Sequence, residues 1–128
     1  MRPKWFVTVA GLAMVAACGG SSSSSPSGPR VTISDFSFSP STLSVKAGTT
    51  VTWTNNGPTM HTTVSDTGVW SSANLAPPTG GGGYGGGTAG GSFQFTFNTP
   101  GSYPYHCSLH PPSNSLYSNF VGTITVTQ

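Results

Sequence analysis

Charged side chains are almost absent from this chain of 128 residues. Asp, Glu, Lys and Arg make up only 5% of the sequence, against roughly 25% in an average soluble domain. With so few basic residues, the dense positive surface that binds phosphates cannot form, and we expect no nucleic-acid partner. The sequence also lacks helical periodicity with capping residues, which excludes a long amphipathic helix or a coiled coil. Its length suits a single domain.

Long apolar runs are missing as well, apart from one short run at the N-terminus. Arg2 and Lys4 precede an apolar run over 5–17, which is shorter than the roughly 17 to 25 residues that cross a bilayer. This pattern predicts a secretory signal peptide over residues 1–17. The run ends in Val-Ala-Ala-Cys, which resembles a bacterial lipobox and implies lipid attachment at Cys18. The alternative is ordinary secretion, with Cys18 lying near a normal cleavage site.

The predicted cleavage would leave a mature chain with little net charge. Two cations and two acids would remain, so the protein would exert almost no long-range electrostatic attraction. Residues 18–30 are rich in Gly and Ser and predict a flexible tether. We therefore expect a monomer that is lipid-anchored in the cell envelope, faces the periplasm or the exterior, and recognises partners through apolar contacts.

From residue 31 onward the sequence has the pattern of short β-strands. Apolar and polar residues alternate with a period of two, and Gly, Pro and Asn mark the turns between them. Residues 31–128 therefore predict one all-β domain, a β-sandwich of about seven or eight strands. Residues 79–91 interrupt the pattern with a glycine-rich insertion, which we expect to be a mobile surface loop. The candidate strands are 31–36, 43–45, 49–54, 61–66, 92–97, 102–107 and 121–127.

One cysteine and two histidines carry the chemistry that the sequence suggests. An unpaired Cys in an oxidising compartment is a liability unless a metal occupies it. Cys107 lies near the end of a candidate strand, and His110 follows three residues later, while His61 begins another candidate strand. One thiolate with two imidazoles suits a copper ion. His106 should point to the opposite face from Cys107, because side chains alternate along a strand.

The segment 93–110, which contains the Tyr-His-Cys-Ser-Leu-His sequence, resembles the cupredoxins, closest to amicyanin and plastocyanin. Residues 43–56 and 121–126 share this resemblance. It implies a Greek-key β-sandwich in which His61, Cys107 and His110 bind one copper ion that carries single electrons. It also implies that electrons leave through His110, beside Leu109, Pro111 and Pro112, where a redox partner would dock.

The sequence departs from the family at the axial ligand. Phe120 stands where the last-strand alignment would place the family's weak axial Met, and Phe cannot bind a metal. Met60 should point away from the site because it precedes His61 directly. Its carbonyl, or the side chain of Asn114 or Asn119, remains an alternative source of an axial oxygen. We predict three strong ligands and no axial Met.

Other functions remain open at this point. The same three ligands would suit a copper-binding or delivery module without an electron-transfer role, or a zinc site with an open position. A hydrolase with Cys107 as its nucleophile lacks the strand-to-helix turn or helix dipole that would activate the thiol. A β-sandwich that serves only for adhesion is the remaining alternative. We expect an electron carrier and not an enzyme.

Overall fold

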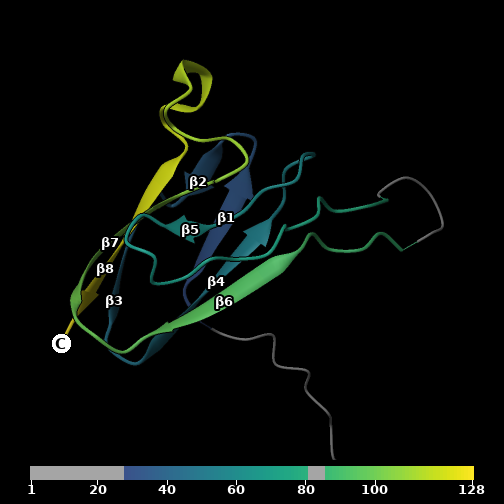
Figure 1. Cartoon of the computed structure of the whole chain (residues 1–128). Helices are drawn as coiled ribbons and strands as arrows, with labels where there is room; N and C mark the ends of the chain where they lie inside the picture. The colour runs from purple at the N-terminus through teal and green to yellow at the C-terminus, as the bar shows by residue number, and fades with distance from the viewer. Residues whose placement is uncertain (1–27, 81–85) are drawn as a thin grey trace, which may run out of the picture.

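A computed structural model of the chain describes residues 28–80 and 86–128 (Figure 1). The predictions for the signal peptide, for Cys18 and for most of the tether lie outside these residues. The described part of the chain holds eight strands, one turn of 3-10 helix (η1) and no helix that is long and apolar enough to span a membrane. The elements are β1 (Arg30–Ser34), β2 (Ser37–Ser39), β3 (Thr42–Lys46), β4 (Thr49–Asn55), β5 (Val64–Ser65), β6 (Ser92–Phe97), β7 (Gly101–His106), η1 (Ser115–Tyr117) and β8 (Val121–Thr127).

The strands form two four-stranded sheets that pack face to face. One sheet has the order β2-β1-β4-β6 and the other the order β3-β8-β7-β5. The pairs β1–β4 and β3–β8 are parallel, and the remaining pairs are antiparallel. Successive strands after β2 repeatedly cross from one sheet to the other. The predicted all-β Greek-key sandwich is confirmed.

Alternation along the strands places one face of each sheet in the core. In β8 the buried residues are Gly122, Ile124 and Val126, and the residues between them are exposed or half-buried. In β1 the buried residues are Val31 and Ile33. Large aromatic side chains fill the space between the sheets, with Trp53 and Phe97 at most 1% exposed. Phe93 and Phe95 pack against this core half-buried.

A glycine in β8 allows the closest approach within the second sheet. Gly122 lies opposite Tyr105 of β7. A Cβ atom on Gly122 would lie 2.2 Å from Cζ of the Tyr105 ring, far inside van der Waals contact. The ring of Tyr105, which is 1% exposed, therefore occupies the space that a side chain on β8 would need.

Two strand predictions need correction. The strand expected over 61–66 is paired in the sheet only at Val64–Ser65, because its neighbour β7 ends at His106 opposite Val64. His61 instead forms an isolated bridge with Leu75. The short strand β2 was missed, since three residues with one apolar member show no alternation.

The described flanks of the glycine-rich insertion are held in place by backbone hydrogen bonds. Thr79 and Thr88 each donate a backbone N–H to the other's carbonyl. Gly91 donates to the carbonyl of Ala76 and accepts from the N–H of Asn55 at the end of β4. The mobility expected of the insertion stays a prediction, and residues 81–85 lie outside the described part of the chain.

Candidate metal centre

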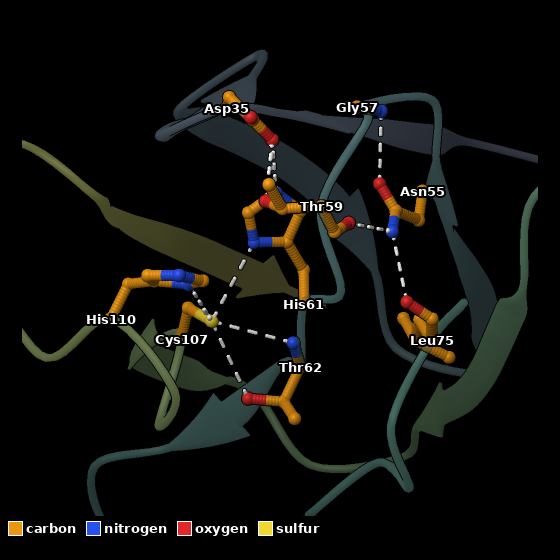
Figure 2. A network of polar contacts seen from close by, with 9 residues as sticks. All are labelled: Asp35, Asn55, Gly57, Thr59, His61, Thr62, Leu75, Cys107 and His110. Atoms are coloured by element: carbon orange, nitrogen blue, oxygen red, sulfur yellow. Dashed lines mark hydrogen bonds and ion pairs between the residues drawn. The ribbon is translucent and has the colours of Figure 1, made fainter. Parts of the chain in front are cut away.

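Three side chains from separate parts of the chain converge at one end of the sandwich (Figure 2). The sulfur of Cys107 lies 3.9 Å from Nδ1 of His61 and 3.6 Å from Nδ1 of His110. All three atoms lie within 4.8 Å of one another. Ligands about 2.0 to 2.3 Å from one ion in a trigonal plane would be about 3.5 to 4 Å apart. The spacing of these three atoms therefore fits one metal ion.

The local backbone positions each of the three residues. Cys107 follows β7 directly, and the turn after it returns His110 towards the sulfur. His61 is fixed by a pair of backbone hydrogen bonds with Leu75, whose N–H and carbonyl both take part. The sulfur and the His61 ring are each 0% exposed, whereas His110 is half-buried. The site thus has a closed side at His61 and a more open side at His110.

The side chain of Asn55 organises the loop that leads to His61. Its Nδ2 donates to the carbonyls of Thr59 and Leu75, each at 2.8 Å. Its Oδ1 accepts from the N–H of Gly57 at 2.9 Å. Asn55 is 0% exposed, so these bonds are shielded from water. One buried amide thereby connects the end of β4 to both backbone segments that flank His61.

Thr62 directs two donors at the sulfur of Cys107. Its backbone N–H donates to Sγ at 3.4 Å, and its hydroxyl lies 3.7 Å from the same atom. The hydroxyl oxygen also accepts from the N–H of Ser108. Donors of this kind favour a negatively charged sulfur, which is the form that binds metals. Sequence reasoning missed Thr62, because only the fold brings it next to a residue 45 positions away.

A comparison of the sequence with known protein families agrees with this site. The family of copper binding proteins that includes plastocyanin and azurin matches residues 29–127. The chain belongs to this family. It is a cupredoxin, a member of a group of copper-binding electron carriers with a His-Cys-His site. The predicted copper cofactor is thereby confirmed, and the donor set at the site is consistent with one copper ion.

Solved structures support the same assignment. The purple cupredoxin from Nitrosopumilus maritimus is 26% identical, with a TM-score of 0.56, and the match covers 77% of this chain and 99% of that one. A reduced mutant of amicyanin is 27% identical, with a TM-score of 0.55, over 80% of this chain and 85% of that one. A copper-containing nitrite reductase from Thermus scotoductus is 24% identical, with a TM-score of 0.60, over 95% of this chain but 25% of the enzyme, and shows the fold alone. No curated protein matches the chain.

Behind His61 the cupredoxin carries a carboxylate. Oδ1 of Asp35 lies 2.7 Å from Nε2 of His61, on the side of the ring that faces away from Cys107 (Figure 2). The hydroxyl of Thr59 donates to the same Oδ1 at 2.8 Å and lies 3.1 Å from Nε2. Desolvation raises the pKa of Asp35, but the hydrogen bonds from Thr59 and His61 outweigh it and leave the pKa below its ordinary value.

On the open side, His110 is surrounded by aromatic rings. The ring centroids of Phe36 and Tyr117 each lie 5.0 Å from that of His110. Desolvation and the neighbouring His61 lower the pKa of His110, while Asp35 acts in the opposite direction. The free imidazole is therefore kept neutral, which is the form that binds a metal.

Phe120 closes the space beside the two imidazoles. It is 0% exposed, and its ring centroid lies 5.1 Å from that of His61 and 6.3 Å from that of His110. The sequence alignment had placed this residue at the axial position of the family. The structure therefore puts an apolar ring next to the ligand cluster.

The remaining sequence candidates have other partners or face the solvent. His106 pairs with the carboxylate of Asp66 at 2.6 Å on the surface, as expected for a cross-strand residue. Met60 is 43% exposed. The side-chain oxygen of Asn114 accepts from the N–H of Leu116 and caps η1. Asn119 is exposed.

Proposed function

We propose that this cupredoxin is a one-electron carrier with a type 1 copper site, in which His61, Cys107 and His110 are the three strong ligands. The observation that carries the proposal is the convergence of one sulfur and two Nδ1 atoms within 4.8 Å. One thiolate and two imidazoles in a trigonal arrangement suit copper in both of its oxidation states. When bound, the copper would supply the one-electron chemistry.

The surroundings of the cluster favour electron transfer over catalysis. His61 is tied to Leu75 by two backbone hydrogen bonds, and Asn55 fixes the preceding loop with three more. Ligands held this firmly move little when the charge of the metal changes. The likeness to a nitrite reductase covers a quarter of that enzyme and carries no activity to this chain. We therefore propose a carrier and not an enzyme.

We further propose that the site has no axial Met. Phe120 packs against the ring of His61, and it offers no donor atom. The axial ligand and the apolarity around the sulfur tune the potential of such sites. An added donor stabilises copper(II) more than copper(I). A site without one should therefore have a higher reduction potential.

The test of the proposed ligands is the spectrum of the copper-loaded protein. The copper(II) form should show an intense visible band from thiolate charge transfer and an electron paramagnetic resonance spectrum typical of type 1 copper. Cys107→Ser should abolish the band, whereas Ser102→Ala, at an exposed position of β7, should keep it. A colourless copper(II) complex of the unaltered protein would overturn the proposal. A colourless site that yields copper(I) quickly to a chelator would favour the delivery module.

Phe120→Met tests the axial position. Met is smaller than Phe and unbranched, so it can enter this space, and the exchange should cost less than the roughly 3 to 5 kcal/mol of truncating a buried Phe to Ala. If Phe120 occupies the axial side, the new thioether should lower the reduction potential and shift the visible band. An unchanged spectrum and potential would place the axial direction elsewhere.

We propose that a redox partner docks at the open end of the site. Leu109 is 45% exposed beside His110, and Leu116 is 78% exposed in the same connection between β7 and β8. In Figure 1 this connection, which carries η1, projects from the end of the sandwich opposite the C-terminus. Leu109→Glu should slow electron exchange with the native partner without changing the visible spectrum.

A lipid anchor at Cys18 is part of the same proposal and rests on the lipobox-like sequence alone. In a bacterial host, the unaltered chain should partition with the membrane fraction and carry a fatty-acid label. Cys18→Ala should release the protein or retain it as an unlipidated precursor. An unlabelled chain that is soluble without the substitution would contradict the anchor.

A further inference from the structure

The carboxylate behind His61 has a position that the ligand set alone does not explain. The ring of His61 is 0% exposed, and its two nitrogens face different partners. Nδ1 faces the sulfur of Cys107, and Nε2 lies 2.7 Å from Oδ1 of Asp35. A neutral imidazole carries one proton, and a carboxylate accepts hydrogen bonds and donates none. Nε2 must therefore be the protonated nitrogen, which leaves the lone pair of Nδ1 free to point at the metal.

Asp35 is held in this position by contacts on several sides. It lies in the turn between β1 and β2, where the next residue, Phe36, has a φ of 57°. The hydroxyl of Thr59 donates to Oδ1 at 2.8 Å. Gly57 packs directly on the residue, since a Cβ atom there would lie 2.6 Å from Oδ1 and 3.0 Å from the backbone nitrogen of Asp35. The loop before His61 is thus shaped around this carboxylate.

We propose that Asp35 is a positioning residue for the copper ligand His61, which fixes the ring with Nδ1 open to the metal and places a negative charge behind it. A carboxylate on the far nitrogen of a metal-binding histidine fixes the tautomer and raises the basicity of the ligand. A more basic ligand stabilises copper(II) more than copper(I). Asp35 therefore lowers the reduction potential of the site. The copper readouts of this inference rest on the proposed function.

The chain offers a matched control in its second histidine–carboxylate pair. Nδ1 of His106 lies 2.6 Å from Oδ1 of Asp66, at partly exposed positions on the surface. Asp66→Asn removes the same charge as Asp35→Asn and changes the same kind of hydrogen bond. It leaves the contacts of the three proposed ligands unchanged.

The first measurement needs no metal. Nitrogen-15 nuclear magnetic resonance of the metal-free protein should show His61 as the Nε2–H tautomer. The double variant Asp35→Ala/Thr59→Val should add the Nδ1–H tautomer, because it removes both the carboxylate and the hydroxyl that lies 3.1 Å from Nε2. Asp35→Asn should retain the original tautomer, because its amide oxygen can still accept from Nε2. Asp66→Asn should leave His61 unchanged.

The second measurement uses the copper-loaded full chain. Asp35→Ala should weaken copper(II) binding by roughly 10- to 100-fold, as expected for outer partners of metal ligands. Asp35→Asn should lose less copper(II) affinity than Asp35→Ala. Its ratio of copper(II) to copper(I) affinity should still be about tenfold lower than that of the unaltered protein. That ratio corresponds to a rise of about 59 mV for one electron. Asp66→Asn should change neither quantity.

The outcomes separate this inference from the proposed function. If Asp35→Ala/Thr59→Val leaves the His61 tautomer unchanged, or if Asp35→Asn and Asp66→Asn shift the potential equally, the inference is overturned. A loss of thermal stability in Asp35→Ala with an unchanged potential would also overturn it, because Asp35 would then only support the fold. If the unaltered protein shows no thiolate charge-transfer band, the proposed function fails, while the tautomer experiment still decides the role of Asp35 in the metal-free protein.

Discussion

The two imidazoles of the site are held by different kinds of interaction. His61 is 0% exposed and is fixed by hydrogen bonds at its backbone and at its far ring nitrogen. His110 is half-buried, and outside the ligand cluster its ring packs against Phe36, Tyr117 and Phe120. Polar bonds set direction and charge at the first ligand, whereas aromatic packing at the second restricts the ring and lets one edge approach solvent. The groups that would set the reduction potential thus lie on the His61 side of the site, and the route to solvent lies on the His110 side.

The test with the largest expected effect removes each imidazole in turn. His61→Gly and His110→Gly should both weaken copper binding by more than the roughly 10- to 100-fold that changes in outer partners cost. Added imidazole should restore the visible band of His110→Gly, because that position is accessible. It should fail with His61→Gly, whose ring is fully enclosed. Equal rescue of both variants, measured by titration with imidazole, would remove the distinction between a closed and an open side.

A second test compares two asparagines that stabilise the loops before and after the ligands. Asn55→Ala removes two buried hydrogen bonds and one that is part-buried, at about 1 kcal/mol each, and should lower the free energy of unfolding by about 3 kcal/mol. Asn114→Ala removes one exposed cap and should cost about 1 kcal/mol or less. Urea unfolding of the metal-free protein measures both. Similar losses would show that the loop after His110 is as firmly built as the loop before His61.

The smallest effect at neutral pH is expected for a substitution of Tyr105, a buried residue of β7. Burial raises the pKa of Tyr105 from 10.0 to about 12. Above pH 10 the unfolded chain loses this proton first, so the stabilisation is complete below pH 10 and is lost as the pH rises towards 12. The total loss is about 2 to 3 kcal/mol. Tyr105→Phe should be nearly silent at neutral pH and should unfold with a weaker alkaline dependence than the unaltered protein.

That variant also serves as a control for the contrast between the ligands. Tyr105 packs in the core between the sheets and takes no part in the polar contacts that join the three proposed ligands. Tyr105→Phe should therefore leave the visible spectrum and the imidazole rescue unchanged. A shift in either would show that the core transmits strain to the site.

Much of this architecture was predictable from the sequence, for reasons that particular residues illustrate. The alternation in β8 and the β-branched and aromatic content of β4 predicted strands where the structure has them. The spacing of Cys107 and His110 predicted their approach, because a two-residue turn brings both side chains to one point. The Greek-key order and the assignment of His61 came from the family resemblance.

The contacts around the ligands were not predictable in the same way. Asp35 counted in the sequence only as one of two acids, and nothing local marks its approach to a ring 26 positions away. Gly57 reads as an ordinary turn residue, although it is the lack of a side chain there that admits the carboxylate. The roles of Asp35 and Gly57 depend on which loops meet at one end of the sandwich. The period-two alternation of a sequence predicts strands but not these contacts between loops.

The absence of a side chain at Gly122 has a consequence for errors in strand pairing. If β8 slipped by one residue against β7, Val121 or Thr123 would meet the ring of Tyr105, which leaves no room even for a Cβ atom. Such a slip would also turn the core residues of β8 to the wrong face. The register of β8 against β7, and with it the place of the thiol that follows β7, is therefore fixed by two separate penalties on a slipped pairing.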